Sequence, residues 1–120
     1  MASPIVWCDI PVVDLERAIR FYSAVLGAKV EKRELGGAVL GVLPHRDGET
    51  GGCLLAGGAH APSAHGPTVY LNANGRLDDA IAAVEPNGGK VLEPKRSIGP
   101  FGFRAIVLDS EGNRLALHSD

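Results

Sequence analysis

The sequence repeats its own pattern, and this repeat constrains the fold more than any other feature. Residues 14–19 (DLERAI) are echoed by residues 76–81 (RLDDAI), and residues 27–30 (GAKV) are echoed by residues 88–91 (GGKV). Each copy has the pattern of a strand, an amphipathic helix, a glycine stop and further strands. Such internal similarity predicts two similar half-sheets in one chain, with the cleft between them as the natural place for a ligand.

Composition limits the classes of partner. The net charge is −2 and no run of lysine or arginine occurs, so we expect no nucleic-acid partner. No apolar stretch approaches the roughly 20 residues of a membrane span, and the first residues lack the features of a signal peptide. Cys8 and Cys53 are too few for a disulfide scaffold. We therefore expect reduced, buried thiols, no membrane partner and a cytoplasmic protein.

Hydrophobic periodicity places one helix firmly in the first half. Asp14 is a good N-cap, and Gly27 is suited to end the helix in a left-handed conformation. Between them, apolar residues follow the spacing of one buried helical face: Leu15, Ala18, Ile19, Tyr22, Val25 and Leu26. Strands are expected at 5–12, 28–34, 37–43 and 51–56, where Pro11 indicates an edge or a strand end.

The second half predicts the same order of elements. We expect strands at 67–72, 90–94, 101–108 and 114–118, a shorter helix around 77–84 and a hairpin loop at 109–113. The domain organisation is then one domain made of repeat 1 (4–57), a linker (58–66) and repeat 2 (67–119). The predicted fold class is α+β, with two βαβββ modules forming a curved mixed sheet of about eight strands around a cleft, and helices on the outside.

Three segments resemble the vicinal oxygen chelate superfamily, also called the glyoxalase/bleomycin resistance protein/dioxygenase group. They are IPVVDLERAIRFYSAVLGAKV (10–30), GGKVLEP (88–94) and FGFRAIVLDSEGNRLALHS (101–119). The resemblance implies the same fold and a homodimer that often completes each cleft from two chains. It does not select an activity, because the superfamily includes isomerases, dioxygenases, thiol transferases, epimerases and drug-binding proteins.

The resemblance also gives positions for a metal. Metal-dependent members present His or Glu ligands from four strands, and these positions fall on Trp7, Thr68, Ala116 and the strand 51–56 (GGCLLA). None of them carries an imidazole or a carboxylate, and a lone threonine hydroxyl is a poor ligand for a divalent ion. The resemblance therefore implies no metal at the usual place, no cofactor, and a likeness to the binding-only branch.

Strand alternation adds further candidates to these positions. His118 lies two residues after Ala116 and Tyr70 lies two residues after Thr68, so each pair shares a face of its strand. His118 is a polar contact to the ligand, a proton carrier or a histidine at the rim of the cleft.

On the first strand, Asp9 shares a face with Trp7, whose indole either stacks on a planar ligand or fills the core. A carboxylate inside a cleft needs a partner, and Arg104 or Tyr70 is a candidate for that role.

A glycine-aromatic stretch, residues 99–104 (GPFGFR), precedes a strand and borders the ligand in relatives, by resemblance. The sequence does not fix whether Phe103 or Arg104 points inward. The predicted ligand-binding set is Trp7, Asp9, Thr68, Tyr70, Phe101, Arg104, Ala116 and His118, with no catalytic residue assigned.

Three functions follow as hypotheses. The leading one is a metal-independent protein of the bleomycin-resistance-like type that binds a small molecule, either a drug or an aromatic metabolite. The alternative is a glyoxalase- or dioxygenase-type lyase or isomerase with a displaced metal, in which His118 acts with Asp9 or with a residue of the partner chain. The third is a sensor or interaction module whose cleft is vestigial.

Overall fold

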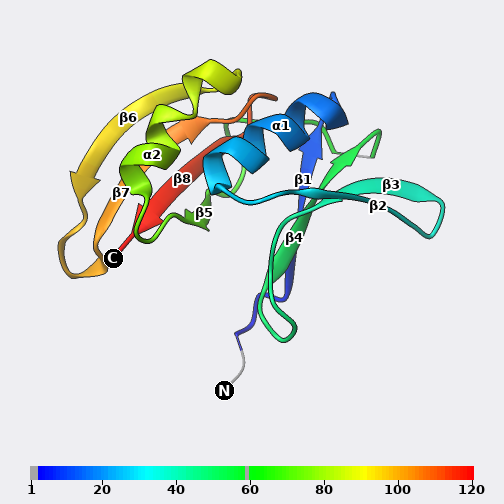
Figure 1. Cartoon of the computed structure of the whole chain (residues 1–120), viewed down its shortest axis with the longest axis horizontal. Helices are drawn as coiled ribbons and strands as arrows, with labels where there is room; N and C mark the ends of the chain where they lie inside the picture. Colours follow the sequence, from blue (N-terminus) through cyan, green and yellow to red (C-terminus); the bar gives the residue numbers. More distant parts are fainter. Residues whose placement is uncertain (1–2, 59) are drawn as a thin grey trace.

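The computed structural model describes residues 3–58 and 60–120. Within these residues the chain repeats the order βαβββ, which confirms the predicted α+β fold of two modules (Figure 1). The first module contains β1 (Trp7–Val12), α1 (Leu15–Leu26), β2 (Glu31–Leu35), β3 (Ala38–Val42) and β4 (Gly51–Ala56). The second contains β5 (Val69–Asn72), α2 (Leu77–Ala82), β6 (Lys90–Ser97), β7 (Phe103–Leu108) and β8 (Arg114–Ser119), with 3₁₀ turns at Glu85–Asn87 and Gly99–Phe101.

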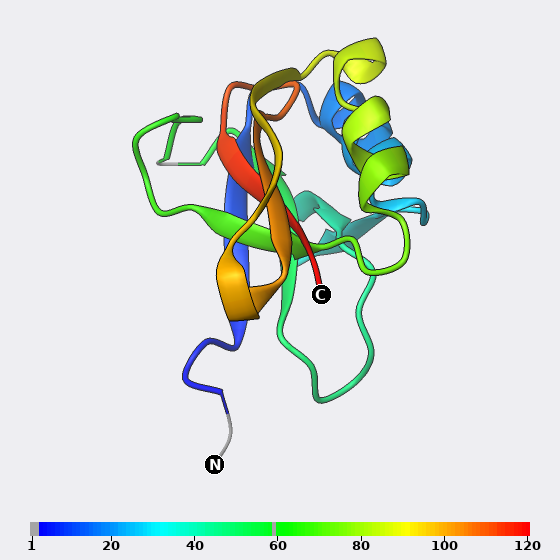
Figure 2. The ribbon, with the colours of Figure 1, turned by 90° about the vertical axis from the view of Figure 1, so that its left-hand side faces the viewer.

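The eight strands of the described residues form two sheets of four, not one continuous sheet. Their orders are β1-β4-β3-β2 and β5-β8-β7-β6, so the two modules share one topology. In each module the first strand pairs in parallel with the last, and the remaining pairs are antiparallel. Figure 2 shows both helices on one side of the two sheets. Neither helix in the described part of the chain is long and apolar enough to cross a membrane.

The core lies between the helices and one face of each sheet. Asp14 caps α1 by accepting a hydrogen bond from the Arg17 backbone N–H at 3.0 Å, and Gly27 ends the helix at φ 68°. The buried face of α1 consists of Ala18, Phe21, Tyr22 and Val25, all without solvent exposure. Phe21 was not part of the predicted stripe. It is buried because α2 and the 3₁₀ turn at Glu85–Asn87 also pack against α1, which widens the buried face beyond one helical stripe.

Two predicted strand boundaries in the second module are wrong. The second strand of this module does not end at Pro94, because β6 continues to Ser97. It is the edge strand of its sheet, where a proline removes no essential ladder hydrogen bond. Phe101 does not begin β7, because it lies in a 3₁₀ turn that is closed by Gly102 at φ 95° and ψ −132°, a conformation open almost only to glycine.

A buried carboxylate joins the two modules. Glu111, in the loop between β7 and β8, accepts hydrogen bonds from the backbone N–H groups of Val13 and Asp14 at 2.9 and 2.8 Å. The Arg17 guanidinium donates to both Glu111 oxygens at 2.7 and 2.9 Å. The Glu111 side chain has no solvent exposure. The last loop of the chain therefore holds the start of the first helix.

Stability is expected to decrease at acid pH because of Glu111. Burial would raise the pKa of this carboxyl group, but the hydrogen bonds from Arg17 and the backbone lower its pKa from 4.5 to about 2. As pH falls, the unfolded chain therefore binds a proton at Glu111 before the folded chain does. Glu111 contributes on the order of 2 kcal/mol to the free energy of unfolding above pH 4.5, and this contribution is lost as pH falls toward 2. Urea denaturation at pH 6, 4 and 3 should show this loss in the wild type. A Glu111→Gln variant should be less stable at all three pH values, and its free energy of unfolding should not show the decrease that protonation of Glu111 causes.

Candidate functional site

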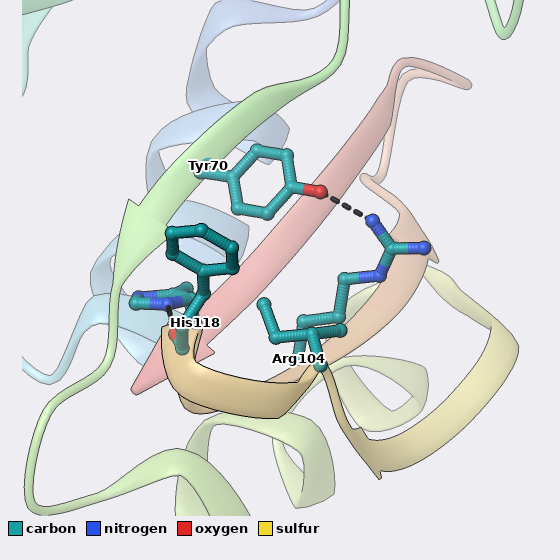
Figure 3. A pocket seen from close by; sticks show the side chains of 5 residues that line it. Tyr70, Arg104 and His118 are labelled. Carbon is teal, nitrogen blue, oxygen red and sulfur yellow. Dashed lines mark hydrogen bonds between the residues drawn. The ribbon is translucent and has the colours of Figure 1, made fainter. Parts of the chain in front are cut away.

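An open pocket lies on the face of the second sheet that points away from the helices. Its volume is about 480 Å³, and its lining consists of Tyr70, Ile98, Phe101, Arg104 and His118 (Figure 3). We call it the β5–β8 pocket. Tyr70 and Phe101 are 48% and 73% exposed, so the pocket presents aromatic surface to solvent. Exposed aromatic surface around a concavity is typical of a site for an organic ligand.

The strand register explains why these residues meet. Leu115 and Leu117 of β8 face the core, so His118 must face the other way. In the antiparallel pairing of β7 with β8, Arg104 lies opposite His118, which places both side chains on the pocket face. Arg104, and not Phe103, is therefore the inward residue that the sequence left undecided. Ile98 and Phe101 come from the turn before β7.

Hydrogen bonds hold the polar groups of the pocket in place. The Nη1 atom of Arg104 donates to the Tyr70 hydroxyl oxygen, drawn as the dashed line in Figure 3, and its guanidinium carbon lies 5.9 Å from the Tyr70 ring centroid. The Tyr70 and His118 rings are 6.1 Å apart at 60°. His118 Nε2 lies 2.6 Å from the Phe101 carbonyl oxygen, so this nitrogen carries the proton and donates it. The arrangement fixes the aromatic walls and the guanidinium relative to one another.

A second group of predicted residues lies on the first sheet. The Trp7 indole N–H and the Cys53 thiol both donate to Oδ1 of Asp9, at 3.1 and 3.3 Å. Trp7 also packs edge-on against His45, with the ring centroids 5.5 Å apart. The expectation that Arg104 or Tyr70 pairs with Asp9 is wrong. Arg104 and Tyr70 are hydrogen-bonded to each other on the other sheet.

The Cys53 thiol is not an activated nucleophile. Burial and its hydrogen bond to Asp9 raise the pKa of this thiol to about 11. It therefore stays protonated near neutral pH, whereas a reactive cysteine needs a lowered pKa. The same direction holds for Cys8, whose pKa is raised by burial and then by the neighbouring Asp9.

The remaining two predicted residues belong to neither group. The Thr68 hydroxyl accepts a hydrogen bond from Arg114 Nη1 at 3.0 Å. Ala116 is fully buried, with Tyr70 and Ile106 as its strand neighbours. Of the eight predicted residues, the structure thus brings four together in one pocket: Tyr70, Phe101, Arg104 and His118. It adds Ile98, which the sequence analysis missed and which only its position in a loop beside a glycine-aromatic stretch could have suggested.

The residues that the structure describes do not fit a divalent metal ion within one chain. Among residues 3–58 and 60–120, no three His, Cys, Asp or Glu side chains are grouped closely enough to hold one. The positions implied by the resemblance carry an indole, a hydroxyl, a methyl group and the strand β4, which has no His, Asp or Glu. His45 and Asp9 both lie beside Trp7, but they do not form part of such a group.

Comparisons with known proteins agree on the fold. A glyoxalase/bleomycin resistance protein from Albidiferax ferrireducens superposes with a TM-score of 0.77 at 22% identity, covering 98% of this chain and 99% of the other. A glyoxalase-related enzyme from Fulvimarina pelagi gives 0.70 at 14% identity, covering 98% and 88%. A mutant glyoxalase I from Zea mays gives 0.70 at 22% identity, and the match covers 95% of this chain and 45% of that longer one. No curated protein matches.

The sequence profile of the Glyoxalase/Bleomycin resistance protein/Dioxygenase superfamily matches residues 4–117, which is nearly the whole chain. The solved structures, all below 25% identity, share the fold and do not identify an activity. With its two βαβββ modules and this match, the chain belongs to the Glyoxalase/Bleomycin resistance protein/Dioxygenase superfamily.

Proposed function

We propose that this protein binds small aromatic or apolar molecules without a metal ion, as a bleomycin-resistance-like binding protein does. One observation carries the proposal: Tyr70, Phe101 and Ile98 line an open pocket of about 480 Å³ together with Arg104 and His118, while the metal positions implied by the resemblance hold no imidazole or carboxylate. A cavity of this size is within the range of small-molecule sites, roughly 300 to 1,000 Å³. Drugs and aromatic metabolites are the candidate ligands.

The proposal predicts binding that does not depend on metal. Purified protein treated with a chelator should bind a two-ring aromatic probe as tightly as protein incubated with zinc, nickel, manganese or iron, and elemental analysis should find no stoichiometric metal. Replacing Tyr70 by alanine should weaken probe binding by about ten-fold or more, because an aromatic wall contributes on the order of 1.5 kcal/mol. Trp7→Ala is the matched control, since Trp7 lies outside the β5–β8 pocket. The proposal is contradicted if each chain holds one metal ion tightly and the probe binds only when that ion is present.

The alternative is a lyase, isomerase or dioxygenase with a displaced metal bound through His118. His118 and Asp9 lie on different sheets, and no three His, Cys, Asp or Glu side chains of residues 3–58 and 60–120 are grouped closely enough to hold an ion. This alternative requires ligands from a partner chain. It predicts that His118→Ala abolishes metal uptake and turnover together, whereas our proposal predicts no change in metal content.

We also propose that the protein forms a homodimer. The large apolar side chains of Ile5, Val6 and Val13 are 63%, 75% and 71% exposed in the single chain, beside the half-exposed Trp7. Exposed apolar groups near one edge strand support burial against a second copy. Light scattering after size exclusion should give twice the 12.5 kDa mass of the chain. A monomer at all micromolar concentrations contradicts this proposal and leaves the binding proposal intact.

A cytoplasmic location belongs to the same proposal. Cys8 and Cys53 are both free thiols, and Cys53 is buried. Free thiols persist in reducing compartments, which supports a cytoplasmic protein. Fractionation of the source cells, followed by detection with an antibody, would test the location.

A further inference from the structure

No carboxylate of the described residues forms an ion pair with Arg104. By contrast, Arg96 and Arg114 of the same sheet each lie within 4.0 Å of the Glu93 carboxylate. Its one hydrogen bond within residues 3–58 and 60–120 goes to the neutral Tyr70 hydroxyl. Its Nε atom is buried and has no hydrogen-bond partner in this described part of the chain. A guanidinium carries five N–H donors, so most of the capacity of this group is unused.

The groups around Arg104 do not supply the missing charge. The pocket lining contains no aspartate and no glutamate. Across the strand pair, the neighbour of Arg104 is Arg96, a second cation on the same face. The nearest carboxylate to Arg96 is that of Glu93, at 3.9 Å, and both of those side chains are about half exposed. Glu93 also lies 4.0 Å from the Arg114 guanidinium, so its carboxylate is shared by Arg96 and Arg114 and forms no ion pair with Arg104.

From this arrangement we infer that the β5–β8 pocket binds aromatic carboxylates, with the ligand carboxylate pairing with Arg104 and the ring system lying against Tyr70 and Phe101. The inference rests on the proposed small-molecule binding and names its ligand class. A planar guanidinium matches a carboxylate with two parallel hydrogen bonds, which gives direction as well as affinity.

The hydrogen bonds already present favour an acceptor-rich ligand group. The Tyr70 oxygen accepts from Arg104, so the phenolic proton of Tyr70 is free to donate to a ligand oxygen. His118 uses its Nε2 proton on the Phe101 carbonyl and does not compete for the ligand. At the Arg104 end of the pocket, the unused hydrogens of both Arg104 and Tyr70 are donors. Two donors and one positive charge select an anion over a neutral amide and against an ammonium group.

The wild-type protein tests the ligand class with three probes of one shape. Isothermal titration at pH 7 should give naphthoate an affinity at least about ten-fold above that of naphthamide, because a charge-assisted hydrogen bond is worth more than a neutral one. Naphthylmethylammonium should bind more weakly than the amide. The preference for naphthoate should narrow as salt is raised, whereas the affinity for naphthamide should stay nearly constant.

Substitutions assign the preference to one residue. Arg104→Gln should lower naphthoate affinity at least about ten-fold and leave naphthamide affinity within about two-fold. Arg104→Lys should retain part of the preference, because it keeps the charge and loses the planar fork. Arg33→Gln is the matched control: it removes the same charge from an exposed arginine of the first sheet and should change neither affinity.

The outcomes separate this inference from the proposed function. Equal binding of naphthoate and naphthamide overturns the carboxylate inference and leaves small-molecule binding standing. A preference for naphthoate that survives Arg104→Gln overturns the assignment to this pocket. Failure of all three probes to bind at millimolar concentration contradicts the proposed function itself, and the inference falls with it.

Discussion

Replacing Glu111 by alanine is expected to lower the free energy of unfolding by about 3 kcal/mol, because it removes a buried acceptor of several hydrogen bonds. The backbone N–H groups of Val13 and Asp14 and the guanidinium of Arg17 would all lose this partner. Arg17 is 43% exposed and can regain water, which keeps the expected loss at the lower end for a broken buried pair. Urea denaturation followed by circular dichroism measures the change.

Glu16, in the first turn of α1, provides the control. Glu16 pairs with Lys32, but both side chains are more than half exposed, at 59% and 55%. Glu16→Ala should therefore cost less than about 1 kcal/mol. If the two variants lose the same stability, the burial and hydrogen bonding of Glu111 are not what makes it important, and the joining of the two modules through this carboxylate is contradicted.

Replacing Gly102 by alanine is expected to cost about 3 kcal/mol and to weaken ligand binding at the same time. An added Cβ would lie 2.1 Å from the Ser119 carbonyl oxygen and 2.9 Å from the Asp120 Cα, both of them backbone atoms. The backbone at φ 95° is also unfavourable for any residue with a side chain. Relief of the clash must move the turn that carries Phe101 away from the end of β8, where His118 lies. Thermal denaturation and titration with naphthoate measure the two effects.

A substitution at Gly99, in the same turn, separates the cost of the backbone conformation from the cost of a steric clash. It also has a positive φ of 70°, but an added Cβ would have no atom within 4 Å. Gly99→Ala should cost only about 1 kcal/mol, the conformational part of the penalty, and should leave the pocket intact. Equal losses in both variants would show that the close approach of β8 to Gly102 is unimportant.

The sequence predicts most of the fold because the signals are local and occur twice. The helix between Asp14 and Gly27 and the strand β4 have the predicted positions, since an N-cap, a glycine stop and an apolar run act within a few residues. Pro94 led to a wrong predicted strand end, because a proline ends a strand only where the ladder requires a backbone N–H donor at that position. Whether it is needed depends on the order of strands in the sheet, which is not a local property.

The site was predictable only within a sheet. Alternation along β5 and β8 correctly indicates that Tyr70 and His118 share a face, and the pairing of β7 with β8 adds Arg104. Alternation does not say how two sheets meet. Trp7 and Asp9 therefore seemed to be neighbours of His118, whereas the structure gives them His45 and Cys53 as neighbours. The absence of an ion pair between Arg104 and any carboxylate of the described residues could not be known without the positions of every carboxylate around it.

The parallel pairing of the first strand with the last one in each module has a consequence for biosynthesis. While the chain leaves the ribosome, β1 has no ladder partner until residues 51–56 have followed it, because its register runs from Trp7 opposite Gly51 to Val12 opposite Ala56. The apolar strand β1 therefore remains without a partner strand until most of the first module has been synthesised. Glu111 reaches the N-terminus of α1 only after β5, α2, β6 and β7 have been synthesised.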